Sequence, residues 1–398
     1  MMGKSEIQAS VTQLVGRCTA PLGALALLAS VLVAAPQEVR GYELQFEGWS
    51  EDLRPLVASS TSLAPYAGHV EYDVLGFRLE YSTIFRGEEI TVSGLIVVPL
   101  DVEDEAPILV WSHGTLFDER SAPSSWRHPL QIQLMPALSG MITFMPDYVG
   151  YGASAELIHP YILNDCLVSV IDMIHAGRQF LEEEGFPFSD ELHLFGFSEG
   201  GYVALATAHE LDTNAKHGLE VTQVNAISGP YDIFEAARLI LSDESYPIPA
   251  YSALLLAAYN ERYWHRPTTE FFQEPYADLM ARFQSRKVGL GLLAGSMPST
   301  IGQLMSPAFT SRFEGDGEVE VKAALKANAV PPWAPSMPVF LYHGTADRDV
   351  PLSVGEKQHK AMLAAGADAR RLSFTVYEGA GHSATVFKAV RSFFERQQ

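Results

Sequence analysis

The pentapeptide Gly196–Gly200, with the sequence Gly-Phe-Ser-Glu-Gly, constrains this chain more than any other stretch. An apolar run at 192–195 precedes it, and an Ala-rich stretch suited to a helix, 202–208, follows it. This order predicts a strand, a sharp turn and a helix, with Ser198 at the tip of the turn. Glycine on both sides would let strand and helix pass close together. The serine Oγ would then project from the carboxyl end of a strand, beside N–H groups that favour negative charge.

Short apolar runs alternate with stretches of helical periodicity along most of the chain. Two antiparallel strands are expected first, at 68–83 and 89–99, joined by a hairpin turn at 86–88. Further buried strands are expected at 108–111, 141–145, 192–195, 221–227, 337–342 and 372–377, with helices at 163–184, 202–208, 352–365 and 384–396. Buried strands that alternate with helices indicate an α/β fold, with a mostly parallel central sheet covered by helices on both faces.

One connection between predicted strands is much longer than the others. About 100 residues separate the strands at 221–227 and 337–342, far more than a connection between parallel strands needs. This stretch is rich in Tyr, Phe, Leu and Met. We interpret 231–335 as a helical cap or lid inserted into a core formed by 71–230 and 336–398. The alternative is a peripheral helical element that does not contact the substrate.

The first 35 residues have the pattern of a secretory signal peptide. Two basic residues precede an almost unbroken apolar run from Leu22 to Ala35, which is too short for a comfortable membrane span of ~20 residues. We therefore expect a secreted or periplasmic protein with no stable membrane partner after cleavage. Because Pro36 disfavours cleavage, an uncleaved N-terminal membrane anchor is the alternative. Residues 36–70 lack clear periodicity, and we expect them to form an extended lead-in.

Charge and composition limit the partners of the chain. A formal net charge of −21 argues against a nucleic-acid partner, because phosphate binding needs a basic surface. The sequence has no metal-ligand spacing, no Gly-rich phosphate loop and no dinucleotide fingerprint, so we expect neither a metal nor a cofactor. Only Cys166 of the two cysteines would remain after removal of residues 1–35, which leaves no intramolecular disulfide. We expect Cys166 to be a packed helix residue.

Two residues near the end of the chain could activate Ser198. A serine hydroxyl is a good nucleophile only when a base takes its proton and a carboxylate orients that base. Asp347 and His382 each follow a predicted strand, so both would lie with Ser198 at the carboxyl edge of the sheet, where ligands bind. Asp349 is the competing carboxylate. We favour Asp347, because the turn into the following Val-Pro makes Asp349 a loop-capping or surface group.

Gly196–Gly200, Asp347 with the following Val350-Pro351, and Gly381-His382 together resemble the α/β-hydrolase superfamily. The resemblance covers about residues 70–398, and the helical insertion falls where that family places its cap. The loop at 147–152 and the length of the cap are most similar to secreted lipase-like and esterase members. The resemblance implies a serine hydrolase that cleaves carboxylic esters through an acyl-enzyme. Ser198 would be the nucleophile, His382 the base and Asp347 the carboxylate that orients it.

The resemblance also implies where the oxyanion would bind. One donor would be the N–H of Glu199, and the other the N–H of Thr115 in the loop that begins at His113. The Thr115 hydroxyl is either a third donor or part of a loop turn. We expect the Glu199 side chain to face solvent or the cap, and His113 to hold its loop by hydrogen bonds. Tyr148 and Tyr151 are candidate substrate-binding residues; packing of their loop against the sheet is the interpretation we favour.

Other functions stay open. A peptidase of the prolyl oligopeptidase kind shares the triad and the turn around Ser198, but the short segment before the sheet leaves no room for its large N-terminal propeller. A small aminopeptidase with a cap, or an enzyme that transfers the acyl group to an alcohol, would need no such domain. A catalytically inactive binding protein is a further alternative. Loss of a triad residue would be its mark, and all three residues are present.

Overall fold

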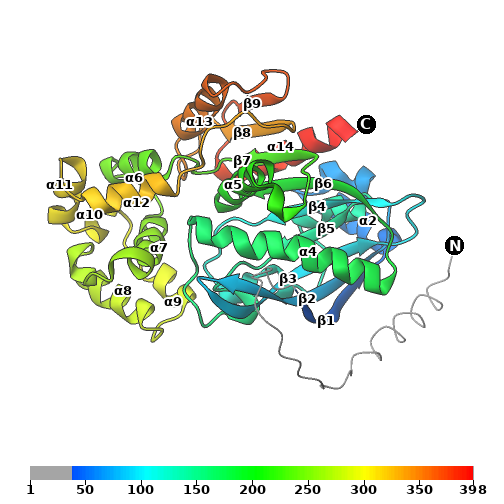
Figure 1. The fold of residues 1–398 in the computed structure, drawn as a ribbon, viewed down its shortest axis with the longest axis horizontal. Coiled ribbons are helices and arrows are strands. Elements are labelled where there is room, and N and C mark those ends of the chain that lie inside the picture. The colour runs from blue at the N-terminus through cyan, green and yellow to red at the C-terminus, as the bar shows by residue number, and fades with distance from the viewer. Residues whose placement is uncertain (1–37, 398) are drawn as a thin grey trace.

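The structure, a computed structural model of the 398-residue chain, describes residues 38–397. The expected signal peptide at 1–35 lies outside the described residues. Nine strands of the described part form one mixed sheet in the order β1-β2-β3-β5-β4-β6-β7-β8-β9 (Figure 1). They are β1 (Val39–Gly48), β2 (Val74–Phe85), β3 (Glu88–Pro99), β4 (Ala106–Ser112), β5 (Ile142–Pro146), β6 (Phe188–Phe197), β7 (Gln223–Ile227), β8 (Val339–Gly344) and β9 (Leu372–Tyr377).

The pairing of these strands is mostly parallel, as the sequence predicts. From β5 to β9 every neighbouring pair is parallel, whereas β1, β2 and β3 form an antiparallel edge that joins β5. The predicted hairpin is also present: Phe85 pairs with Glu88, and the two residues between them have φ angles of 53° and 88°. Two positive φ angles match a turn that follows the natural twist of the strands.

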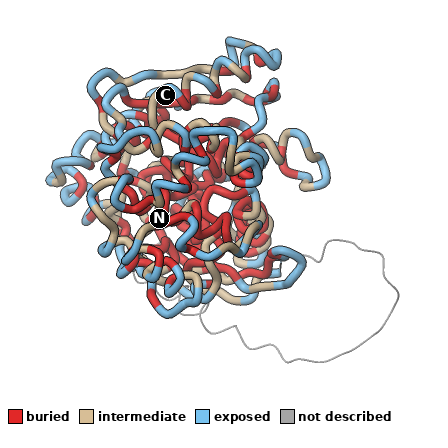
Figure 2. The backbone as a smooth tube through the Cα atoms, turned by 90° about the vertical axis from the view of Figure 1, so that its left-hand side faces the viewer, coloured by how far each residue is buried: buried red, intermediate tan, exposed pale blue. Residues whose placement is uncertain are grey.

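Helices cover both faces of the sheet. The α-helices of the described part are α2 (Ser50–Ser59), α3 (Met135–Leu138), α4 (Leu167–Glu184), α5 (Glu199–Thr213), α6 (Ile233–Ser242), α7 (Pro249–Tyr259), α8 (Tyr276–Gln284), α9 (Leu290–Gly295), α10 (Ile301–Leu304), α11 (Pro307–Glu314), α12 (Val319–Ala327), α13 (Leu352–Ala364) and α14 (His382–Gln397). Helices α4 and α5 share a core with Val110 and Leu194, and α3 and α14 share another with Trp111 and Phe195. Successive strand residues thus serve opposite faces, and burial is concentrated in the centre (Figure 2).

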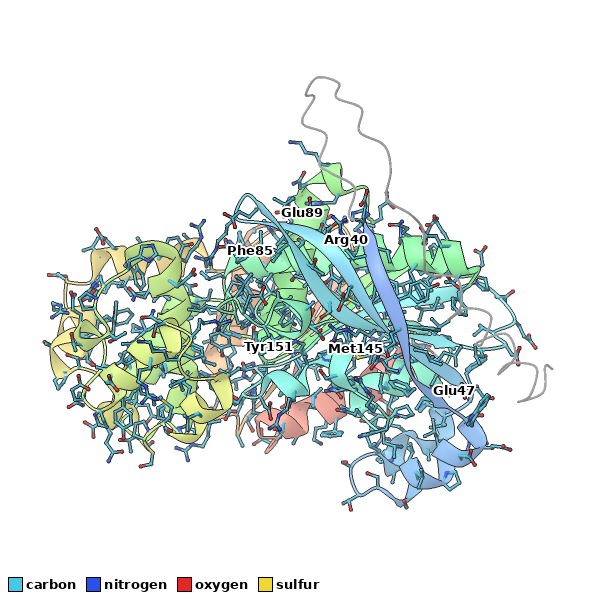
Figure 3. The ribbon with its side chains drawn as sticks, turned by 90° about the horizontal axis from the view of Figure 1, so that it is seen from below. Arg40, Glu47, Phe85, Glu89, Met145 and Tyr151 are labelled. Atoms are coloured by element: carbon cyan, nitrogen blue, oxygen red, sulfur yellow. The ribbon has the colours of Figure 1, made fainter. Side chains whose placement is uncertain are left out.

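Residues 38–70 differ from the extended lead-in that the sequence predicts for 36–70. Strand β1 pairs antiparallel with β2, and α2 buries Leu53 and Val57. Arg40 of β1 forms an ion pair with Glu89 of β3, which Figure 3 shows at one edge of the sheet. The strand was missed because β1 is an edge strand with mostly half-exposed side chains, so its apolar alternation is weak.

The long connection between β7 and β8 contains helices α6 to α12. These helices gather at one end of the molecule, on the left of Figure 1, while β1 and α2 lie toward the opposite end. An apolar interior holds them together, with Phe271, Phe309 and Leu304 buried. Within residues 38–397, none of the helices has the length and apolar character required to cross a bilayer.

Candidate active site

Ser198 occupies a strained turn between β6 and α5. Its φ and ψ angles are 59° and −123°, a conformation that costs a non-glycine residue on the order of 1–3 kcal/mol. A Cβ on Gly196 would lie 1.9 Å from the Gly200 carbonyl oxygen, and a Cβ on Gly200 would lie 1.9 Å from that of Ser112. Only glycine fits at either position. The turn therefore holds Ser198 at the carboxyl end of β6, as the sequence pattern predicts.

Asp347 and His382 meet at the carboxyl ends of β8 and β9. Asp347 Oδ2 lies 2.7 Å from Nδ1 of His382, and its Oδ1 accepts the N–H groups of Asp349 and Val350, each at 3.0 Å. Burial alone would raise the pKa of Asp347, but hydrogen bonds from His343 and His382 outweigh it and hold that pKa well below its usual range. The carboxylate is therefore ionised and fixed in orientation.

The hydrogen bond to Asp347 decides which nitrogen of His382 is free to act. Because the carboxylate accepts the proton on Nδ1, the other nitrogen, Nε2, carries the lone pair. Nε2 is buried and has no hydrogen-bond partner among the described residues. The imidazole packs on Phe197, next to Ser198, with ring centroids 4.6 Å apart. The free nitrogen of the ring is therefore available to act as a general base, although it is not hydrogen-bonded to Ser198 in this structure.

The loop from His113 to Thr115 passes directly beside Ser198. A Cβ on Gly114 would lie 3.4 Å from Cβ of Ser198. Neither the N–H of Thr115 nor that of Glu199 donates to another group within residues 38–397. Both are thus available as oxyanion donors. The Thr115 hydroxyl, in contrast, donates to the Tyr161 hydroxyl at 3.1 Å, which favours the loop role over a third oxyanion donor.

The side chain of His113 contacts the backbone of this loop and of the neighbouring 147–152 loop. Its Nδ1 lies 2.7 Å from the Gly114 carbonyl oxygen, and its Nε2 lies 3.1 Å from that of Asp147. Burial lowers the pKa of His113, so the ring stays neutral in this enclosed position. These contacts match the loop-holding role expected from the sequence.

Tyr148 and Tyr151 do not line the cavity beside Ser198, and the substrate-binding interpretation of this pair is replaced by packing. Tyr148 stacks on His113 at 4.1 Å and donates to the His113 carbonyl at 3.0 Å. Tyr151 donates to the carbonyl of Leu116 at 2.9 Å. Figure 3 shows Tyr151 near the sheet. Both hydroxyls are used to hold the loop that carries the oxyanion donors, which leaves neither free for a substrate.

A cavity of about 60 Å³ opens beside Ser198 and extends among the helices of the insertion. Its walls are mainly apolar and come largely from α6, α7, α11 and α12. The lining comprises Tyr161, Ile162, Ser198, Glu199, Pro230, Ile233, Ala236, Ala237, Ile240, Leu241, Tyr246, Tyr251, Ser252, Leu255, Leu256, Phe309, Phe313, Val321, Leu325, Asp349 and Val350. The nucleophile and the helices of the insertion therefore border the same cavity.

Two acidic side chains in this lining differ from expectation. Glu199 was expected to face solvent or the cap; its side chain is fully buried and lies 2.5 Å from Nε2 of His159. Asp349 does not orient His382, but it borders the cavity, where burial raises its pKa. Sequence reasoning missed His159 altogether, because it lies on a loop without any periodic pattern.

Within residues 38–397, no group of three or more His, Cys, Asp or Glu side chains could hold a metal ion. Cys166 is buried and free, and burial followed by the Glu199 carboxylate raises the pKa of its thiol well above the usual value. A thiol kept protonated is a weak nucleophile, so Ser198 is the better one.

The strained serine, the His–Asp pair and the mixed sheet together define a class of hydrolases, and the comparisons with known proteins agree. The sequence profile of the alpha/beta hydrolase family matches residues 108–390. The chain therefore belongs to the alpha/beta hydrolase family. No curated protein sequence matches it.

Solved structures resemble the whole described fold. A Legionella pneumophila protein, provisionally described as a hydrolase, superposes with a TM-score of 0.80 at 23% identity, covering 90% of this chain and 98% of its own. The rice cell wall degrading esterase LipA from Xanthomonas oryzae superposes with a TM-score of 0.75 at 22% identity, covering 91% of this chain and 96% of its own. Candida antarctica lipase A in its closed state superposes with a TM-score of 0.62 at 15% identity, covering 87% of this chain and 78% of its own. At these identities the likeness concerns the fold.

Proposed function

We propose that this alpha/beta hydrolase cleaves carboxylic esters through an acyl-enzyme on Ser198. The observation that carries the proposal is the hydrogen bond of 2.7 Å between His382 and Asp347 at the sheet edge where Ser198 projects. A fixed carboxylate, an imidazole with its lone pair free and a strained serine are the three parts of acyl transfer by a serine nucleophile.

In the proposed mechanism Ser198 attacks the ester carbonyl while Nε2 of His382 takes its proton. Asp347 holds the imidazole tautomer and stabilises the imidazolium that forms. The N–H groups of Thr115 and Glu199 bind the oxyanion of the tetrahedral intermediate. The imidazolium then protonates the leaving alcohol. Water, activated by the same imidazole, attacks the acyl-enzyme and releases the acid.

The shape of the cavity supports an apolar acyl group as the part of the ester that enters it. Side chains from α6 and α12, including Ile233, Leu241, Val321 and Leu325, line the space that begins at Ser198. Burying an alkyl chain there would contribute about 0.8 kcal/mol for each methylene removed from water. We therefore propose that residues 231–335 act as a cap that binds the acyl chain.

The named activities of the structural neighbours support ester hydrolysis over the alternatives. LipA is an esterase, and the Candida antarctica protein is a lipase. An aminopeptidase or an acyltransferase would use the same serine, so substrate tests must separate them.

The sequence of residues 1–35 supports export as a further part of the proposal. This segment has a basic start and an apolar run of signal-peptide length. Neutral or lipid-like esters outside the cytoplasm would then be the substrates, with no nucleic-acid partner, given the net charge of −21.

Hydrolysis of p-nitrophenyl esters from acetyl to palmitoyl, by the protein and by its Ser198→Ala variant, tests the function. We expect turnover in the first and loss of about 10³-fold or more in the second. The chain length with the highest kcat/KM would separate a carboxylesterase from a lipase. Equal rates in both proteins would refute the proposal. Cleavage of aminoacyl amides, but not of esters, would instead favour the peptidase. Transfer of the acyl group to an added alcohol, in preference to water, would favour the acyltransferase.

A further inference from the structure

The carboxylate next to the nucleophile is paired with a histidine that the proposed mechanism does not use. Glu199 follows Ser198 directly, and its side chain is completely buried. Oε1 lies 2.5 Å from Nε2 of His159, while Oε2 has no hydrogen-bond partner among the described residues. His159 is itself 90% buried, since its side chain is 10% exposed. The two side chains form a buried pair directly behind a predicted oxyanion donor.

The second nitrogen of His159 fixes how many protons this pair holds. Nδ1 lies 2.8 Å from the carbonyl oxygen of Val149, which can only accept, so Nδ1 carries a hydrogen. Nε2 would then have a lone pair pointing at Glu199 Oε1. Two lone pairs at 2.5 Å would repel, so one further proton must lie between these atoms. The pair is therefore neutral overall, as an imidazolium with a carboxylate or as an imidazole with a carboxylic acid.

Among residues 38–397, no side chain other than that of His159 forms an ion pair with Glu199. Its ionisable neighbours, besides His159, are His113, Cys166 and tyrosines, among them Tyr148 and Tyr161. Burial, with the Glu199 carboxylate as the next cause, raises the pKa of Cys166, Tyr148 and Tyr161. Burial lowers the pKa of His113. The thiol and the two phenols thus stay neutral, and His159 is the group whose hydrogen bond to Glu199 places it to compensate the carboxylate.

We propose that His159 is a positioning residue that keeps the Glu199–His159 pair neutral overall, so that the oxyanion forms beside no uncompensated negative charge. The inference rests on the proposed function, because it concerns the oxyanion held by the N–H of Glu199. A bare carboxylate on the residue that supplies this N–H would repel the developing oxyanion. His159 also ties Glu199 to the loop of Val149, which His113 holds against the oxyanion loop.

The proposal is tested by removing His159 and then restoring activity with a second substitution at Glu199. A role in packing alone does not predict this rescue. In His159→Leu the carboxyl loses its partner, and we expect kcat for a p-nitrophenyl ester to fall on the order of 10²-fold, with little change in KM. Glu199→Gln removes the charge and keeps the backbone N–H. We therefore expect the double variant His159→Leu/Glu199→Gln to recover at least about tenfold over His159→Leu.

A double variant as slow as His159→Leu, or slower, would overturn the proposal, because a packing role predicts losses that add. An unchanged kcat in His159→Leu would overturn it as well. If His159→Leu does not fold, His159→Gln replaces it: the amide donates to Glu199 without supplying charge, and the same rescue by Glu199→Gln is expected. Circular dichroism and thermal unfolding establish that each variant is folded.

A matched pair elsewhere in the chain provides the control. His217 lies 2.9 Å from Glu210 at the surface, far along α5 from Ser198, so His217→Leu should leave kcat unchanged. Binding of phenylboronic acid, which forms a tetrahedral anion on the serine, separates this inference from the proposed function. We expect weaker binding in His159→Leu and recovery in the double variant, even if no ester were turned over. Equal affinity in all three would contradict the role assigned to His159.

Discussion

His382 donates its Nδ1–H to Asp347 across 2.7 Å, and the same carboxylate accepts two backbone N–H groups from the loop that follows. These three hydrogen bonds fix the carboxylate, which in turn fixes the orientation of the imidazole ring. In Asp347→Asn the amide would favour the wrong imidazole tautomer, so we expect kcat to fall about 10³- to 10⁴-fold with KM nearly unchanged. Steady-state kinetics on a p-nitrophenyl ester measure this loss. Asp349→Asn is the control, and an equal loss there would reassign the carboxylate.

Low pH should lower the free energy of unfolding, because it protonates Asp347. Its pKa in the folded protein lies well below the unfolded value of ~3.9, because hydrogen bonds from His343 and His382 outweigh burial. Such a group stabilises fully above the unfolded pKa, and this contribution is lost as pH falls through the folded pKa. We expect the difference in unfolding free energy between the protein and Asp347→Asn to shrink as pH falls from about 5 toward about 2. Urea titrations at each pH measure it.

Asp368 is the matched control for this pH dependence. Hydrogen bonds from Arg370 lower its pKa to about 2, but the pair is open to solvent, since the side chains of Asp368 and Arg370 are 37% and 90% exposed. Solvent screens such a pair, so we expect Asp368→Asn to have little effect on stability at any pH. A difference for Asp347→Asn that stays constant across the range would contradict the assigned pKa shift.

The turn around Ser198 should tolerate no side chain at Gly200. An alanine Cβ there would lie 1.9 Å from the Ser112 carbonyl oxygen, a contact that only movement of β4 or α5 could relieve. We expect Gly200→Ala to destabilise the protein by about 3 kcal/mol or more. Gly302→Ala in α10 meets nothing within 4 Å and should raise stability by about 0.5–1 kcal/mol. Thermal unfolding of both variants gives the comparison; similar melting temperatures would argue against the close strand–helix crossing.

The length of the acyl chain should depend on the α6 wall of the cavity. Ala237 is 9% exposed and borders the space that begins at Ser198. Ala237→Leu would fill part of this space, so we expect the preferred ester to become shorter and kcat/KM for the longest chains to fall about tenfold or more. The acetyl ester, which leaves the far part of the cavity empty, is the internal control. An unchanged chain-length profile would mean that the acyl group binds elsewhere.

A variant of Tyr148 would show whether this residue holds the loop or binds the substrate. Its hydroxyl donates to the His113 carbonyl at 3.0 Å, behind the predicted oxyanion donor Thr115. We expect Tyr148→Phe to lower kcat about tenfold and to leave KM unchanged, because the loop would lose one hydrogen bond of about 1 kcal/mol. A raised KM with normal kcat would instead restore Tyr148 to the substrate path.

The sequence alone was sufficient to predict eight of the nine described strands and to propose the three residues of the triad, for a local reason. Ser198, Asp347 and His382 each follow a buried apolar strand directly, and parallel strands place their carboxyl ends at one edge. Glycines beside Ser198 add a second local signal, because strain and close approach demand them.

Contacts between loops could not be predicted in the same way. His159 meets Glu199 only because the 155–163 loop folds back over the start of α5, and nothing periodic in that loop fixes its path. The role of Tyr148 likewise depends on a hydrogen bond to His113, 35 residues away in sequence. Strand β1 was missed because its side chains are half-exposed on an edge. Each of these features depends on tertiary contacts and not on a sequence period.

The most direct test of the central claim is to trap the acyl-enzyme. After rapid mixing with p-nitrophenyl butyrate and an acid quench, mass spectrometry of the digested protein would show which residue carries a butyryl group. We predict the added mass on the peptide that contains Ser198, together with a burst of p-nitrophenolate that matches the enzyme concentration. Neither should appear in Ser198→Ala. A butyryl group on another residue, or hydrolysis that persists in Ser198→Ala, would contradict the account.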